Sequence, residues 1–240
     1  MKKNIVFGAL LLAAGSLLAA DSASKDDVTA AAKKLADTSY SWKTTMDLGA
    51  DSPFTPGPTE GKVEKDGYTW LSSSFQDNTS IAIAKEKKVA VKTEEGWKSG
   101  EELGDGGGGF DPNTMMVRRL QNLKTPAAEI QEIVGKVAEL KKDGDVISGN
   151  LTEEGAQSLL TSGFGFGGRR GGNRPPAKEA KGSVKIWLKD GQVVKYETKV
   201  TGKMDRNGEE QLIDRTTTTE IKDIGKTKIE VPDDAKKKLS

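Results

Sequence analysis

Residues 182–232 constrain the fold most, because they have the pattern of long antiparallel strands joined by tight turns. Apolar and polar residues alternate along the first run, as expected for a strand with one buried face. Asp190-Gly191 follows, and Asp-Gly between two such runs predicts a hairpin, since both central residues of its turn need positive φ. The chain returns over residues 192–202 and again over 210–223, and strands of this length predict one broad, twisted sheet whose apolar face must be covered. The face of the second strand that we expect to be buried comprises Val194, Tyr196, Thr198 and Val200.

The chain begins with a segment typical of a secretory signal peptide, residues 1–20. Lys2 and Lys3 precede an apolar run over residues 5–18, which leads into small residues suited to cleavage after Ala20. This run is shorter than the ~20 apolar residues that a membrane-spanning helix needs. We therefore predict an exported protein, periplasmic or secreted, that has no stable membrane anchor.

Composition excludes several classes of function. The absence of Cys excludes disulfides, thiolate metal sites and the lipid-modified cysteine of a bacterial lipoprotein. The absence of His removes the commonest general base and transition-metal ligand, and neighbouring acids such as Glu94 and Glu95 would point to opposite faces of a strand. Cleavage would remove two lysines and no acid, so the net charge would change from +1 to −1 and would favour no charged partner. We expect no enzymatic activity, no cofactor or metal, and no nucleic-acid partner.

The first half of the mature chain predicts one short helix followed by a meander of strands. Ser24, with an acid three residues later, begins a helical pattern over residues 24–37. Residues 40–48 alternate as a half-buried strand, with Tyr40, Trp42 and Met46 on one side. Further strands are expected at residues 61–65, 68–74, 80–84 and 88–93, with Trp97 after them.

The second half interrupts the strands with helices and flexible insertions, within a single domain of residues 21–240. Glycine-rich stretches predict flexible insertions at residues 104–109 and 163–181. One helical pattern begins at Asp111. Another covers residues 127–142 and has a long apolar side. The remaining expected elements are a strand at residues 145–151, a helix at 152–162, a last strand at 226–231 and a polar tail at 233–240.

This order of elements resembles that of the lipoprotein carrier superfamily. The resemblance includes the closing segment Asp223-Ile-Gly-Lys-Thr-Lys-Ile-Glu-Val-Pro-Asp-Asp. That superfamily includes the periplasmic LolA-type carriers and the mycobacterial LppX and LprG types. The resemblance spans most of residues 24–235. It implies an α+β fold in which a curved antiparallel sheet of roughly eleven strands forms an open half-barrel. Helices would cover the concave face and enclose a cavity for acyl chains.

One feature of these carriers has no counterpart in the early part of this chain. Their early strands bear an arginine that helps to gate the lid. Here the first arginine is Arg118, and the corresponding region carries Lys62, Lys65 and Lys85. The resemblance implies no catalytic residue.

Large apolar residues from the expected strands and helices form the candidate ligand-binding site. In an open barrel they would line a hydrophobic cavity, for which adaptable methionines are well suited, whereas in a tightly closed one they would be core. The first case predicts a monomeric binder of an acyl chain or lipoprotein lipid, whose partners are lipids, acylated proteins and envelope proteins. The second predicts a structural or protein-interaction module of the cell envelope with a filled core. The set comprises Trp42, Met46, Trp70, Ile81, Ile83, Val91, Trp97, Met115, Met116, Leu120, Ile130, Ile133 and Val137.

Overall fold

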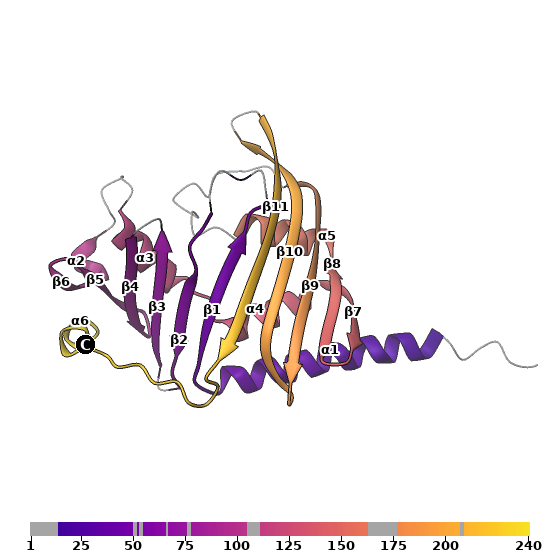
Figure 1. Ribbon diagram of the computed structural model, residues 1–240, viewed down its shortest axis with the longest axis horizontal. Coiled ribbons are helices and arrows are strands. Elements are labelled where there is room, and N and C mark those ends of the chain that lie inside the picture. Colours follow the sequence, from indigo (N-terminus) through magenta and orange to yellow (C-terminus); the bar gives the residue numbers. More distant parts are fainter. Residues whose placement is uncertain are drawn as a thin grey trace, which may run out of the picture.

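The computed structural model describes residues 14–49, 52, 55–65, 67–75, 78–104, 111–162, 177–206 and 209–240. Within them, eleven strands form one open antiparallel sheet in the order β6-β5-β4-β3-β2-β1-β11-β10-β9-β8-β7 (Figure 1). The expected α+β half-barrel is thereby confirmed. The strands are β1 Tyr40–Asp47, β2 Thr59–Val63, β3 Tyr68–Phe75, β4 Asn78–Lys85, β5 Lys88–Thr93, β6 Gly96–Ser99, β7 Val137–Asp143, β8 Val146–Leu151, β9 Lys178–Lys189, β10 Gln192–Arg206 and β11 Glu209–Lys222.

The sheet consists of two meanders, the first formed by β1 to β6 and the second by β7 to β11. Within each meander every strand pairs with its neighbour in sequence, and one pairing of β1 with β11 joins the two. The second meander contains the longest strands, because β10 has 15 residues and β11 has 14. These two strands extend beyond the rest of the sheet (Figure 1).

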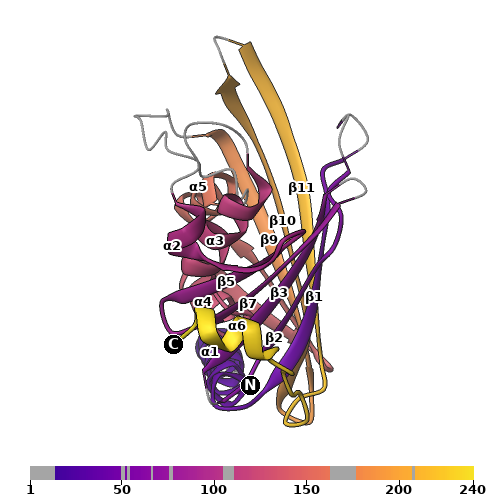
Figure 2. The ribbon, with the colours of Figure 1, turned by 90° about the vertical axis from the view of Figure 1, so that its left-hand side faces the viewer.

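Six helices accompany the sheet within the described residues, and α3, α4 and α5 lie together on its concave side (Figure 2). The long helix α1 crosses the ends of the strands, where Lys142 Nζ lies 2.8 Å from Asp27 Oδ2 and Lys25 donates to the Val137 carbonyl. None of the helices in this part of the chain has both the length and the apolarity of a membrane span. The helices are α1 Ala14–Ala36, α2 Gly100–Leu103, α3 Pro112–Gln121, α4 Pro126–Gly135, α5 Glu153–Ser162 and α6 Asp233–Lys238.

The main core lies between the helices and the concave side of the sheet, which we call the inner face. Its residues form one contiguous group, the inner cluster, to which both meanders and helices α1, α3, α4 and α5 contribute. Leu71 of β3, Ile130 of α4 and Ile186 of β9 are fully buried there. Burial of this apolar surface is the main stabilising contribution to the fold.

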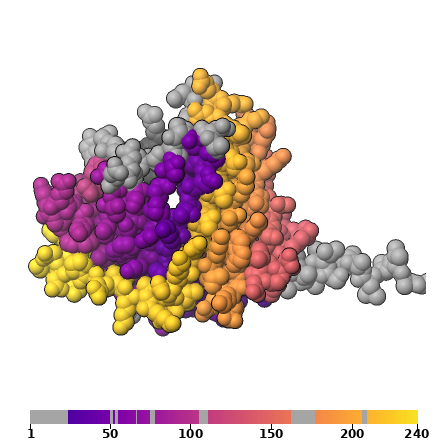
Figure 3. Space-filling model, viewed as in Figure 1, coloured from indigo at the N-terminus to yellow at the C-terminus, as the bar shows by residue number. Residues whose placement is uncertain are grey.

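The opposite, outer face of the first meander is also covered. Ile83 and Ala90 point to this face and pack against Ala235 and Leu239 of the C-terminal segment; these four residues are the outer cluster. Figure 3 shows the C-terminal segment, in yellow, across the lower part of the violet strands, while the orange strands of the second meander are uncovered. Strands β4 and β5 are therefore buried on both faces.

The predicted helix over residues 127–142 is wrong beyond Gly135, where α4 ends and strand β7 soon begins. A register irregularity in β7, between Val137 and Glu139, explains the error. An extra residue in a strand shifts the alternation of its side chains, so Val137 and Leu140 are both buried although they are three residues apart. That spacing is typical of a helix, and the bulge produces it in a strand.

A second irregularity, between Val193 and Lys195, corrects the expected face of β10. Tyr196 and Val200 are buried as predicted, but Val193 replaces Val194 as the fully buried residue at the start of the strand. Both errors have the same cause, because bulges are set by strand pairing and not by local sequence pattern.

The C-terminal predictions also need correction. Residues 226–231 form no strand, and residues 233–240, expected to be a polar tail, contain α6. This helix was missed because five of its six residues, all except Ala235, are lysines or aspartates, and its apolar partners lie far away in the sequence. A six-residue helix has little stability alone and depends on such packing.

Two predicted boundaries differ from the structure. Strand β9 begins at Lys178, so the last part of the expected insertion at 163–181 is strand. Helix α1 begins at Ala14, and Ser24 therefore lies inside it and not at its start. Residues 163–176 of that insertion, residues 105–109 of the other and residues 1–13 of the expected signal peptide lie outside the described residues.

Candidate functional site

The structure divides the predicted binding residues between the two faces of the sheet. One group belongs to the inner cluster: Trp42, Val91, Met116, Leu120, Ile130, Ile133 and Val137. A second group, Trp70, Ile83 and Trp97, belongs to the outer cluster or packs against it. Met46, Ile81 and Met115 are partly exposed and belong to neither. A ligand between sheet and helices could therefore contact only the first group together.

On the inner face, side chains of the first group continue into an apolar row that crosses the sheet. Trp42 of β1 faces Gly61 of β2 on one side and Ile221 of β11 on the other. A Cβ atom at Gly61 would lie 2.0 Å from the Trp42 ring, so glycine is what allows the indole to lie across β2. The apolar row comprises Val91, Ala82, Leu71, Gly61, Trp42 and Ile221, each the cross-strand partner of the next.

Directly beside the apolar row runs a row of hydroxyl groups on the same face. It crosses six adjacent strands and spans the junction of the two meanders, where the Oγ1 atoms of Thr44 and Thr219 lie 2.9 Å apart. Six cross-strand neighbours with hydroxyls on an otherwise apolar face form a continuous line of hydrogen-bonding groups. The hydroxyl row comprises Ser80, Ser73, Thr59, Thr44, Thr219 and Tyr196, each opposite the next.

Helix α3 places a cation against this row. Arg119 donates from Nη1 to Ser73 Oγ and from Nη2 to Thr59 Oγ1, both at 2.6 Å. No carboxylate of the described residues lies within ion-pair distance of its guanidinium. Loss of solvent lowers the pKa of Arg119, and the Glu129 carboxyl acts in the opposite direction. A guanidinium nevertheless stays protonated in proteins, so a positive charge faces the hydroxyl row.

Helix α4 places an acid at the other end of the row. The Tyr196 hydroxyl donates to Glu129, and burial raises the pKa of the Glu129 carboxyl above its ordinary value. Burial also raises the pKa of Tyr196 well above its ordinary value, and the charge of Glu129 adds to this effect. Nearby, the Tyr40 hydroxyl accepts from the Ala127 backbone N–H at 3.4 Å. The interior under α3 and α4 thus contains a polar band beside an apolar one.

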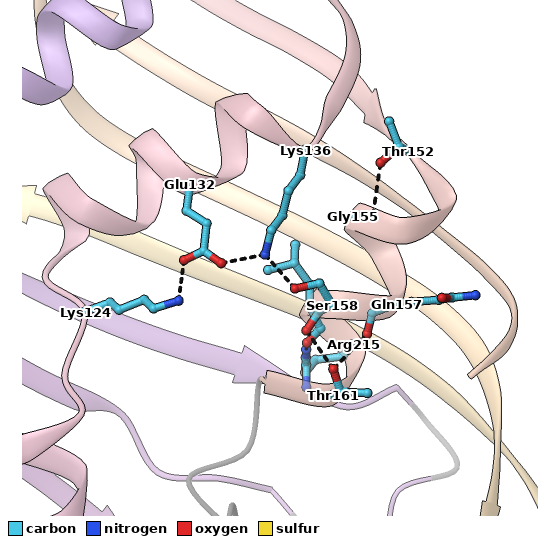
Figure 4. Close-up of polar contacts among 10 residues, drawn as sticks. Lys124, Glu132, Lys136, Thr152, Gly155, Gln157, Ser158, Thr161 and Arg215 are labelled. Atoms are coloured by element: carbon cyan, nitrogen blue, oxygen red, sulfur yellow. Dashed lines mark hydrogen bonds and ion pairs between the residues drawn. The ribbon is translucent and has the colours of Figure 1, made fainter. Parts of the chain in front are cut away.

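Hydrogen bonds fasten the helices at the second meander (Figure 4). Lys136 Nζ, next to the end of α4, lies 2.6 Å from both Glu132 Oε1 and Ser158 Oγ of α5. Hydrogen bonds from Lys124, then from Lys136, lower the pKa of Glu132. Arg215 of β11 donates to a backbone carbonyl of α5, that of Leu159. Helix α5 is thereby attached to both α4 and the sheet.

Sequence reasoning missed the polar half of this site. Arg119 and Glu129 are charged residues beside the apolar stripes of their helices, and that position was the available signal. The hydroxyls also carry a signal, because all of them except Tyr196 lie two residues from a residue of the apolar row, as Thr44 does from Trp42. Only the pairing of β1 with β11, however, shows that they form one row.

Similarity to known proteins is found in the structure and not in the sequence. No family model matches the sequence, and no curated protein is similar to it. Among solved structures, lipoprotein LppX of Mycobacterium tuberculosis is similar with a TM-score of 0.48 and 11% identity, covering 88% of this chain and 100% of that one. LprF of Mycobacterium bovis follows with a TM-score of 0.44 and 12% identity, covering 88% and 97%.

A LolA superfamily protein of Nitrosomonas europaea is also similar, with a TM-score of 0.30 and 6% identity over 92% of this chain and 97% of that one. At identities this low, the likeness concerns the fold alone and not the residues of a site.

Proposed function

We propose that this protein binds an amphipathic lipid, an acyl chain with a polar head, between the inner face of its sheet and helices α3 and α4. The observation that supports this is the apolar row beside the hydroxyl row. An acyl chain gains free energy by leaving water for an apolar surface, and a polar head needs hydrogen-bonding partners where it is buried. Arg119 and the hydroxyls of Thr59 and Ser73 offer such partners next to Trp42 and Leu71.

Binding requires a change in the helix layer. Leu71 and Ile130 are fully buried, so the helices are closed on the sheet in this structure. To admit a chain, α3 and α4 must move away, and Arg119 must exchange its bonds to Thr59 and Ser73 for bonds to the ligand. Figure 3 shows a narrow gap among the indigo and violet atoms of the first strands, through which the background is visible.

The proposed setting is outside the cytoplasm. Residues 1–20 have the pattern of a signal peptide, which supports export and cleavage before the protein acts. In that setting the protein would hold or carry acyl chains or lipoprotein lipids, and would do so without catalysis.

The complete burial of the inner cluster favours a second candidate function, a structural or interaction module whose core is simply filled. Native mass spectrometry after mild purification separates the two. Co-purified lipid, and saturable binding of a fluorescent fatty acid, are expected for the lipid binder. A clean apo mass together with no binding of the probe would leave the filled module as the better account.

A pair of double variants tests the hydroxyl row itself. Thr44→Val with Thr219→Val removes two facing hydroxyls together at nearly constant volume, and Tyr196, which loses its hydrogen bond with Thr219, keeps the one to Glu129. This double variant should weaken binding of the fluorescent fatty acid by about tenfold. The matched control is Thr45→Val with Thr218→Val, cross-strand neighbours on the outer face of the same two strands. Equal affinities for the two double variants would contradict the placement of the head group on the hydroxyl row.

A further inference from the structure

Arg119 of α3 is a cation whose bonded partners are neutral. Its guanidinium donates to Ser73 Oγ and Thr59 Oγ1, and hydroxyl oxygens satisfy N–H groups without carrying a charge. Among the described residues, no carboxylate forms an ion pair with Arg119. A charge that leaves water costs free energy unless an opposite charge accompanies it, and loss of solvent lowers the pKa of this guanidinium. The closed site therefore holds a positive charge that no bonded anion of these residues compensates.

The acid at the other end of the hydroxyl row, Glu129, does not take that role. Its carboxyl accepts a hydrogen bond from Tyr196 of β10. Thr59 and Tyr196 are separated by three strand pairings, roughly 14 Å at the usual spacing of neighbouring strands. Burial has the largest effect on the pKa of Glu129, and the charge of Arg119 has a smaller effect than that of Lys124. The hydroxyl row therefore has a cationic end in the first meander and an acidic end in the second.

The cationic end offers hydrogen-bond donors beside an apolar surface. Because Ser73 and Thr59 accept from the guanidinium, each hydroxyl keeps its own hydrogen for donation to a ligand. A guanidinium also has more N–H groups than these two bonds use, and its planar fork matches the two oxygens of a carboxylate. Leu71 and Gly61 of the apolar row lie two residues from Ser73 and Thr59 on the same strands. An acyl chain along the apolar row would thus bring its first carbon atoms to the guanidinium.

We propose that the polar head of the bound lipid is a carboxylate that pairs with Arg119 at the cationic end of the hydroxyl row. This inference rests on the proposed function and narrows its ligand to a fatty acid in its ionised form. One carboxylate compensates one guanidinium, whereas the second charge of a phosphate monoester would stay unpaired. A neutral ester leaves the charge of Arg119 uncompensated, and an ammonium head would be repelled by it.

Three probes with the same chain test the charge of the head: dodecanoate, methyl dodecanoate and dodecylamine, which are anionic, neutral and cationic at neutral pH. Calorimetric titration gives a dissociation constant for each. Because each chain requires the same movement of α3 and α4, the ratio of two constants reports the head group alone.

The test variant is Arg119→Gln, which removes the charge and keeps an N–H donor for the hydroxyls. The matched control is Arg118→Gln, which changes the neighbouring arginine of the same helix, whose side chain lines a pocket beside α2 and α6. Circular dichroism checks that both variants are folded.

The wild type should bind dodecanoate about tenfold more tightly than either of the other probes. Arg119→Gln should lose this preference, whereas Arg118→Gln should keep it. Equal binding of dodecanoate and its methyl ester by the wild type would overturn the inference and leave the lipid function standing, and this measurement depends on no variant. A preference that persists in Arg119→Gln, or that the control loses equally, would overturn it as well.

Two further outcomes concern the rest of the site. A preference for dodecylamine that Glu129→Gln abolishes would place a cationic head at the acidic end of the row and would overturn the inference. If the wild type binds none of the three probes, the proposed lipid function fails and the inference fails with it.

Discussion

The two meanders of this sheet bury their apolar side chains in different ways. In the first, strands β4 and β5 are buried on both faces, with α3 on the inner side and the C-terminal segment on the outer side. The second has long strands with one covered face, and its outer face carries exposed charges such as Lys185 and Lys199. A strand buried on both sides reads as a continuous apolar run, as in Ile81-Ala-Ile-Ala84, while a half-buried strand alternates. The comparison shows that the pattern of apolar residues in a strand indicates whether one or both of its faces are covered.

The largest expected effect compares leucines on the outer face of each meander. Leu239 is 6% exposed and contacts the first meander, whereas Leu212 of β11 is 70% exposed. Leu239→Asp buries an unpaired carboxylate and should lower the free energy of unfolding by about 3 kcal/mol. Leu212→Asp should leave it within about 0.5 kcal/mol. Urea unfolding of both variants measures the difference, and equal losses would show that the outer faces are not distinct.

A smaller effect distinguishes two glycines of the inner face. A Cβ at Gly149 in the second meander would lie 2.0 Å from the Glu139 carbonyl oxygen, at the β7 bulge. At Gly61 in the first meander, the atoms in the way belong to the Trp42 ring. Gly149→Ala should cost about 3 kcal/mol, because backbone must move, and Gly61→Ala about 1–2 kcal/mol.

Rescue sharpens that contrast. A second substitution, Trp42→Leu, should recover part of the stability lost in Gly61→Ala, since it removes the obstructing ring. No comparable truncation exists for Gly149→Ala, whose obstacle is the main chain. Thermal denaturation of the single and double variants measures this recovery. If Trp42→Leu lowered the melting temperature of Gly61→Ala further, the Trp42 ring would not be the obstacle.

The third expected effect concerns pH, at the polar band where the meanders meet. The pKa of Glu129 is raised above its ordinary value of 4.5, mainly by burial. Between 4.5 and the raised pKa, the folded state binds more protons than the unfolded state, so stability falls as pH rises through this window. Above the raised pKa of Glu129, its contribution to the free energy of unfolding no longer changes with pH. Its surroundings include Tyr196, Lys124, Arg119 and Glu132, which contribute smaller effects.

Glu129→Gln should therefore be more stable than the wild type at neutral pH and should have a flatter stability profile in that window. Unfolding by urea at a series of pH values measures both quantities. The matched control is Glu94→Gln, in the exposed turn before β6. A profile for Glu129→Gln that parallels the wild type would contradict the burial of this carboxyl.

The smallest effect is expected from ion pairs on the extended strands of the second meander. Lys178 pairs with Glu210 and Lys203 with Glu179, each at 2.6 Å and exposed to solvent. Such pairs contribute little, because solvent and salt screen them. Lys178→Gln and Lys203→Gln should leave the melting temperature unchanged within experimental error. A clear fall at low salt would show that these strands depend on charge pairing.

The fold was more predictable from sequence than the site, for physical reasons. Alternation and turn residues such as Asp190-Gly191 are local, so most strands of both meanders could be predicted. The bulge at Val137 and the docking of α6 depend on partners distant in sequence, and both were missed. The same holds for the hydroxyl row, because Thr44 and Thr219 are brought together only by the closing pair of strands.

The outer cluster has a consequence for the order in which the chain can fold. Ile83 and Ala90 precede Ala235 and Leu239, which cover them, by a long stretch of sequence and are synthesised well before them. Until then the first meander has one face without its cover, and its β4–β5 region exposes apolar surface to water. The first meander is therefore covered on both faces only after the segment that contains α6 has been synthesised.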